Sequence, residues 1–125
     1  LANMGILFTN LYFRDYIPAY LEAVYPPFWR RELDIEDINV VIQCLESAGV
    51  DSTKFEHFAT SEGKLMHDQI LETRFDAGMY GVPTYVVGED VFFGREHLPY
   101  IRWILSGKNG PAPDIANELL TRETR

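Results

Sequence analysis

The chain has 125 residues, of which 46% are hydrophobic, and carries a formal net charge of −8 at pH 7. This length suits one domain, and this composition favours a folded chain over a disordered one. The acidic balance argues against nucleic acid and anionic membranes as partners, because both attract basic patches, and no apolar run is long enough to span a bilayer.

The first residues and the cysteine content indicate where the protein works. The sequence begins at Leu1 rather than Met and lacks the basic segment of a secretory signal, so we expect a processed or truncated product without a signal peptide. Cys44 is the only cysteine, which excludes an intrachain disulfide or CxxC motif and favours a reducing, cytoplasmic location. Cys44 lies in an apolar helical pattern that is more typical of a small buried hydrophobe than of a nucleophile.

The first part of the chain is predicted to be helical, because its apolar residues recur at helical spacing. Residues 1–9 form the first expected helix. The second has Asp15 as its N-cap and Pro18 in its first turn, and Pro26-Pro27 should kink or end it. Its apolar stripe, more typical of a core than of a cofactor site, consists of Tyr16, Tyr20, Val24 and Phe28.

Three further helices are expected before the pattern changes. Asp34 caps the first, which Gly49 ends. Asp51-Ser52 begins a short second helix, and Ser61-Glu62 caps a third that continues to about Tyr80. Their apolar positions are Ile35, Ile38, Val41, Ile42 and Leu45 in the first, Phe55 and Phe58 in the second, and Met66, Ile70, Leu71, Phe75 and Met79 in the third.

The apolar pattern changes to a period of two at residues 84–93, which predicts a β-hairpin. A helix follows over Glu96–Ser106, and Asp114 caps a last short helix, Ile115–Thr121. The inward residues of the Glu96–Ser106 helix are expected to be Leu98, Ile101 and Leu105. A two-stranded hairpin is marginal alone, so either the sheet is completed from elsewhere or the hairpin lies on the helices.

The segment Gly81-Val82-Pro83-Thr84-Tyr85 directly precedes and begins this hairpin. Proline cannot donate to a strand ladder, so it belongs at a strand start or edge, and its peptide bond can be cis at modest cost. In either isomer the carbonyl and N–H of Val82 are able to face a ligand. The alternative is a loop proline that only precedes a hairpin.

From Gly81 onward, the sequence GVPTYVVGEDVFFGREHL resembles the C-terminal half of a DsbA-like thioredoxin domain. More narrowly it resembles the 2-hydroxychromene-2-carboxylate isomerases and kappa-class glutathione transferases, whose helical insertion is similar to the stretch from Tyr25 to Asp51. The resemblance covers about residues 3–106. It implies an α/β, thioredoxin-like fragment in one compact unit, with a helical insertion (1–80), a ββα part (81–107) and a tail (108–125).

The resemblance also implies what the sequence does not carry. Family members begin with a β-α-β unit that holds a catalytic Ser or a CxxC motif, and nothing in this sequence matches it. We therefore expect the N-terminal β-α-β to be missing and no catalytic residue to lie in this chain. A metal site is not expected either, because His57 and His67 lack metal-ligand spacing.

A glutathione site is the cofactor site that the resemblance implies. Glutathione in the family lies along the cis-proline loop and pairs with the residue before the proline, here Val82 beside Pro83. Its γ-glutamyl carboxylate meets the start of the following helix, here Arg95 and Glu96. Glu96 stands where Asp is usual and His97 where Arg is usual. The alternative is that Glu96 only caps its helix and Arg95 is solvated.

The implied function is glutathione-dependent isomerisation or transfer on a small electrophilic, aromatic substrate. That substrate would lie between the helical insertion and the thioredoxin core, where Tyr and Trp side chains from residues 12–29 are candidates to line the pocket. Two alternatives remain open. One is a thiol-disulfide oxidoreductase whose CxxC lies outside this sequence, and the other is a non-catalytic interaction module that forms a homodimer or pairs through an exposed sheet edge.

Overall fold

Two compact units make up the chain in the computed structural model, which describes residues 1–114. The first comprises Leu1–Glu72, and the second begins at Thr73, before the boundary that the sequence suggested at residue 80. That all parts form one compact unit stays a prediction. The helix expected at Ile115–Thr121 lies outside the described residues. Among the helices within residues 1–114, none has the length and apolar character needed to cross a membrane.

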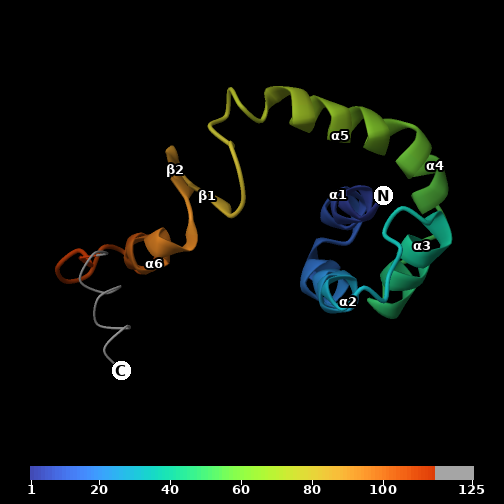
Figure 1. Ribbon diagram of the computed structural model, residues 1–125, viewed down its shortest axis with the longest axis horizontal. Coiled ribbons are helices and arrows are strands. Elements are labelled where there is room, and N and C mark those ends of the chain that lie inside the picture. The colour runs from blue at the N-terminus through green and yellow to red at the C-terminus, as the bar shows by residue number, and fades with distance from the viewer. Residues whose placement is uncertain (115–125) are drawn as a thin grey trace. The chain divides into compact units, whose positions relative to one another are not determined.

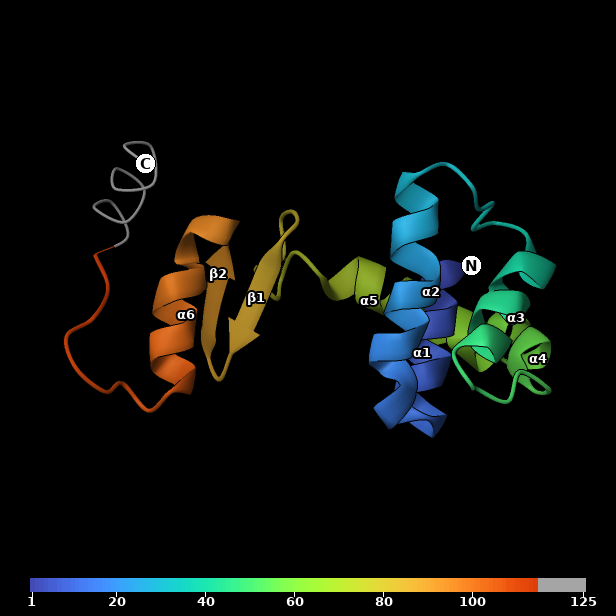
Figure 2. The same cartoon turned by 90° about the horizontal axis from the view of Figure 1, so that it is seen from below.

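The first unit is helical, as predicted, and runs from blue to green in Figure 1. Helix α1 packs against α2, α3 and α4, and α2 also packs against α3. Both views show α1 alongside α2 (Figures 1 and 2). The elements are α1 (Ala2–Tyr12), the 3₁₀ turn η1 (Arg14–Tyr16), α2 (Ile17–Trp29), α3 (Ile38–Ser47), α4 (Phe55–Thr60) and α5 (Glu62–Thr73).

Helix α2 differs from its prediction at both ends. Pro18 lies in its first turn, as expected, but Asp15 is not its N-cap, because Asp15 lies within η1 and α2 begins only after Tyr16. The helix continues through Pro26 and Pro27 to Trp29, so the prolines do not end it, and the alternative that they kink it stays a prediction. Both proline carbonyls still accept hydrogen bonds, from the N–H groups of Arg30 at 3.2 Å and Glu32 at 3.0 Å, and these bonds close the last turn.

The cap of α3 is Asp37 rather than the predicted Asp34. The Asp37 carboxylate accepts a hydrogen bond from the backbone N–H of Asn39 at 2.8 Å, whereas Asp34 accepts one from the N–H of Glu36 in the preceding turn. A carboxylate at this position satisfies one of the unpaired N–H groups of the first helical turn. Gly49 follows α3 with a φ of 84°, in the left-handed region expected of a helix-ending glycine.

Helix α5 ends at Thr73, well before the predicted end near Tyr80. The chain then turns around Gly78, whose φ is 77°, and the N–H of Gly78 bonds the carbonyl of Phe75 at 3.0 Å. Only the first residue of the predicted apolar face, Met66, packs against the core. The remaining four are exposed, namely Ile70, Leu71, Phe75 and Met79. Apolar spacing therefore overestimated both the length of the helix and its burial.

The core of the first unit lies where α1, α2, α3 and α4 meet. Its most deeply buried side chains are Tyr20, Phe55, Leu45, Val41 and Thr9. The Tyr20 hydroxyl donates to the Ala2 carbonyl at 3.0 Å, which satisfies its polar atom inside the core. Cys44 belongs to this core, as predicted, and burial raises the pKa of its thiol. Burying one large apolar side chain of this kind contributes about 1.5–3 kcal/mol.

The second unit contains a two-stranded antiparallel sheet, β1 (Thr84–Val87) and β2 (Asp90–Phe93), followed by the 3₁₀ turn η2 (Arg95–His97) and α6 (Leu98–Leu105). The hairpin matches its prediction, and Gly88 in its turn has a φ of 63°. Helix α6 covers one face of the sheet (Figure 2), where the Phe92 ring lies 6.0 Å from that of Tyr100.

Few side chains of the second unit are buried, because among the described residues only α6 covers the hairpin. Ile101 is buried, as predicted, but Leu98 and Leu105 are exposed, so their predicted inward position was wrong. The hairpin has two strands of four residues each, and its Phe92 contacts α6 at Tyr100. On the opposite face of the sheet, the apolar side chains of Val86, Val91 and Phe93 remain exposed within the described part of the chain.

Candidate functional site

The start of β1 presents an unpaired peptide group. Val82 is 91% exposed, and the Val82–Pro83 peptide bond is cis. The Pro83 carbonyl accepts the N–H of Gly94 at 2.9 Å, which extends the hairpin ladder by one rung, and the Thr84 hydroxyl donates to the Gly81 carbonyl at 2.5 Å. Within residues 1–114, neither the N–H nor the carbonyl of Val82 has a partner. This peptide group is therefore available to an incoming backbone.

The predicted helix-start residues lie at the same end of the hairpin, because the hydrogen bond from Gly94 to Pro83 joins the two segments. Gly94 has a φ of 93°, and the Glu96 carboxylate folds back over it: a methyl group added at Gly94 would lie 2.5 Å from the Glu96 carboxyl carbon. A carboxylate beside the N-terminus of a helical segment is electrostatically favourable. Arg95 is exposed and makes no ion pair with any described residue.

This end of the hairpin thus combines a free peptide group, one guanidinium and one carboxylate. Such groups bind and orient a ligand, but none of them is the thiol or hydroxyl that the resemblance leads us to expect at the active site. Cys44, the only thiol of the 125-residue sequence, is buried in the first unit, so it is not available for this chemistry. Residues 1–114 also hold no group of three His, Cys, Asp or Glu side chains able to bind a metal ion.

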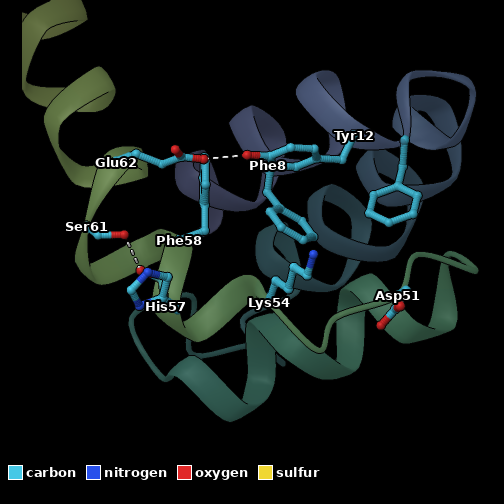
Figure 3. A pocket seen from close by; sticks show the side chains of 9 residues that line it. Phe8, Tyr12, Asp51, Lys54, His57, Phe58, Ser61 and Glu62 are labelled. Atoms are coloured by element: carbon cyan, nitrogen blue, oxygen red, sulfur yellow. Dashed lines mark hydrogen bonds between the residues drawn. The ribbon is translucent and has the colours of Figure 1, made fainter.

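A second candidate site, which the sequence did not reveal, is a pocket of about 310 Å³ in the first unit (Figure 3). One wall comes from α1, where Phe8 and Tyr12 lie one helical turn apart, and from the following Phe13. The facing wall comes from α4 and the residues on either side of it. The lining residues are Phe8, Tyr12, Phe13, Asp51, Lys54, His57, Phe58, Ser61 and Glu62.

Most polar groups of this pocket already have partners. The Tyr12 hydroxyl donates to Glu62 in a short hydrogen bond, and this bond raises the pKa of Tyr12. The Ser61 hydroxyl donates to the His57 carbonyl at 2.6 Å. The pKa of Asp51 is lowered, first by hydrogen bonds from Thr53. The spacing of Lys54, His57 and Ser61, which lie at the start, middle and end of the α4 region, was present in the sequence but is common on solvated helices.

Comparison with known proteins gives a family. The model of the DsbA-like thioredoxin domain matches residues 4–105. A 2-hydroxychromene-2-carboxylate isomerase of Sphingobium xenophagum is 27% identical over 89 residues, which cover 70% of this chain and 46% of the relative. An isomerase of the same name from Pseudomonas putida is 26% identical over 83 residues (64% and 40%), and one from Pseudomonas sp. (strain C18) is 25% identical over 111 residues (84% and 50%).

These matches leave much of each relative uncovered. The chain spans half or less of the length of the curated relatives that it matches. No solved structure matches this chain. The isomerase activity in the names of these relatives therefore refers to whole proteins. The residues described above correspond to one part of such a protein.

Proposed function

Because this chain belongs to the DsbA-like thioredoxin domain family, we propose that it supplies the ligand-binding part of a glutathione-dependent isomerase or transferase acting on a small electrophilic, aromatic substrate. The isomerase names of its relatives support the reaction class. The observation that carries the proposal is the exposed, unpaired peptide group of Val82 beside Pro83.

The Val82 peptide suits a tripeptide ligand. An extended peptide binds a free strand end by forming main-chain hydrogen bonds, as if it were an added strand. Glutathione has a cysteinyl N–H and carbonyl that would meet the carbonyl and N–H of Val82. The first ladder bond after this position, from Gly94 to the Pro83 carbonyl, holds the strand against β2 and leaves the N–H and carbonyl of Val82 free.

Arg95 and Glu96 suit the γ-glutamyl end of the same ligand. That end carries both a carboxylate and an ammonium group, so a guanidinium and a carboxylate side by side match its two charges. Arg95 would bind the carboxylate, and Glu96 would turn from Gly94 towards the ammonium. Hydrogen bonds to charged groups are worth about 1.5–3 kcal/mol each, which makes these two residues the expected determinants of affinity.

In the proposed reaction, the glutathione thiolate adds to a conjugated carbon of the substrate, the adduct rotates about the bond that has lost its double-bond character, and the thiolate leaves again. Glutathione is regenerated, so no oxidant or reductant is required. The residues of this chain would hold glutathione in place during both steps. The activating hydroxyl or thiol is not among them.

Glutathione titration of the 125-residue chain, followed by amide NMR, tests this proposal. We expect shifts at residues 81–84 and 94–97, and we expect Arg95→Ala to weaken binding about tenfold because one charge-assisted contact is lost. Arg102→Ala, which removes an exposed arginine on α6, is the matched control and should bind like the wild type. N-acetylated glutathione, which lacks the ammonium, should bind less tightly unless Glu96 is also replaced by Gln. Absence of shifts at millimolar glutathione would contradict the proposal.

A second candidate function, self-association through the hairpin, is favoured by the exposed apolar face of Val86, Val91 and Phe93. Both outer strand edges also lack a partner strand within residues 1–114. We expect light scattering to give the mass of a dimer, and Val91→Lys to return the mass of one chain. Leu11→Lys, an equally exposed apolar position on α1, is the control. A wild-type chain that is monomeric at high concentration would contradict this candidate.

A further inference from the structure

Three aromatic rings meet in the pocket of the first unit. The ring centre of Phe8 lies 5.2 Å from that of Tyr12 and 5.3 Å from that of Phe58, and the Tyr12 and Phe58 centres are 6.1 Å apart. Their planes are inclined to one another by 59° to 83°, so the three rings present surfaces in different directions. They come from α1 and α4, whose packing holds this arrangement in place.

Rings set at steep angles suit a compact cation. An aromatic face attracts a cation through the quadrupole of the ring, and several faces around one quaternary ammonium group are a common way to bind it. The pocket has a volume of about 310 Å³, at the small end of the usual range of about 300–1,000 Å³ for small-molecule sites. The ligand is therefore expected to be small.

The two carboxylates that line the pocket keep their negative charge. Glu62 accepts a hydrogen bond from the Tyr12 hydroxyl. Hydrogen bonds from Thr53 lower the pKa of Asp51, which favours its ionised form. Lys54 is the only lysine or arginine of the lining, so with its histidine neutral the lining is negative overall. The first unit also contains most of the acidic excess that gives the chain its net charge of −8, which favours a cation over an anion.

The state of these carboxylates also distinguishes between kinds of cation. A primary ammonium has three N–H donors and is strongly hydrated, so it needs several acceptors to replace its water. One oxygen of Glu62 and one of Asp51 already accept hydrogen bonds within the chain. A quaternary ammonium has no N–H donor, so it requires only contact with the rings and a nearby negative charge.

We propose that this pocket binds a small quaternary ammonium compound, with its methyl groups against Phe8, Tyr12 and Phe58 and its charge balanced by Glu62. Glu62 is the expected counter-charge, because it makes no ion pair with any described residue, whereas the charge of Lys54 acts on Asp51. In Figure 3 the Lys54 side chain extends towards the Phe8 ring, so its ammonium opposes a bound cation.

This site is separate from the one proposed for glutathione. Its lining residues all belong to the first unit, whereas Val82 and Arg95 belong to the second. The inference therefore does not rest on the proposed glutathione function, and neither outcome decides the other.

The test is an amide NMR titration of the 125-residue chain with choline, in the absence of glutathione. We expect shifts in residues 8–13 and 54–62. The neutral analogue 3,3-dimethyl-1-butanol, in which carbon replaces the nitrogen of choline, should bind about tenfold less tightly, because it has the same shape without the charge. Phosphocholine distinguishes a free compound from a lipid-type headgroup. Its phosphate adds negative charge within an acidic unit, so it should bind less tightly than choline.

Two charge substitutions should act in opposite directions. Glu62→Gln should weaken choline binding about threefold, because an exposed charge pair contributes modestly. Lys54→Met should tighten it, because the opposing ammonium is removed. Glu56→Gln and Lys64→Met are the matched controls, because both side chains are exposed in the same unit and neither lines the pocket. Both controls should bind choline like the wild type.

The role of the rings is tested at Tyr12, which is exposed enough to tolerate substitution. Tyr12→Leu should bind choline less tightly than Tyr12→Phe, because only the second variant keeps the ring. The comparison of choline with its neutral analogue needs no variant, so it holds even if a variant fails to fold. The proposal would be overturned if the neutral analogue or phosphocholine bound as tightly as choline, or if millimolar choline caused no shifts or only shifts of other residues.

Discussion

Gly5 of α1 lies against Tyr20 of α2, so a Gly5→Ala substitution changes the stability of the first unit through two opposing effects. Alanine is the better helix former, so Gly5→Ala would stabilise an isolated α1 by about 1 kcal/mol. In the folded chain, however, a methyl group at Gly5 would lie 2.5 Å from Cζ of Tyr20 and closer still to its hydroxyl oxygen. Tyr20 is 1% exposed, so its ring is enclosed by the core of the first unit.

The packing effect should win. Overfilling a close-packed core costs about 1–3 kcal/mol. Displacing Tyr20 would also break the hydrogen bond from its hydroxyl to the Ala2 carbonyl, and leaving such a buried group unsatisfied costs about 1–3 kcal/mol more. After the gain in helix propensity, we expect Gly5→Ala to lower the free energy of unfolding of the first unit by about 3 kcal/mol.

Urea denaturation followed by circular dichroism, with hydrogen exchange of the Phe8 and Leu45 amides as a local measure of the first unit, would check this value. Asn10→Ala is the control, because Asn10 is exposed on the same helix and only helix propensity changes there. That variant should be slightly more stable than the wild type. If Gly5→Ala were also as stable as the wild type, the close approach of α1 and α2 at Tyr20 would be refuted.

Three further predictions concern titratable groups. Glu62→Gln should lower the pKa of Tyr12 towards its ordinary value, because the carboxylate that accepts its proton is gone; ¹³C NMR of the tyrosine ring carbons would show no change if the hydrogen bond does not form. Thr53→Val should raise the pKa of Asp51, because one hydrogen bond to its carboxylate is lost. Asp51 contributes stability above its unfolded pKa, and this stability is lost as the pH falls through its lower folded pKa, so the variant should have less of it to lose. A carboxyl NMR titration over about pH 6 to 2 measures the pKa of Asp51 in both proteins. Cys44 should react with a thiol reagent at mildly alkaline pH only after unfolding, and rapid modification of the native chain would argue against its burial.

Local chemistry in the sequence predicted much of this fold. The period-two pattern located the hairpin, and the left-handed position of Gly49 followed from its place after an apolar helix. The sequence offers two residues suited to cap α3, Asp34 and Asp37, and does not distinguish them. The structure identifies Asp37 as the cap, because its carboxylate accepts a hydrogen bond from the N–H of Asn39. Apolar spacing alone also failed to find the end of α5, because a turn around Gly78 interrupts it.

The candidate sites divide in a similar way. The residues around Val82 and Arg95 are recognisable because they form one short contiguous motif that resembles a family. The pocket was not predicted, since Phe8 and Lys54 are far apart in sequence and only the packing of α1 against α4 brings them together. Taken one at a time, the residues that line the pocket have the sequence pattern of ordinary core or surface residues.

The position of Glu96 over Gly94 has a consequence for the choice of ligand. The Glu96 carboxylate lies at the start of the helical segment, where it would compete with the anionic group of a ligand for the same place. Because it is part of the chain, its effective concentration there is high. A ligand that brings only a negative charge must displace this internal anion and leave it without compensation. A ligand that also brings a positive charge gives the displaced carboxylate a new partner. The chain would therefore discriminate against simple anions without any contact dedicated to rejecting them.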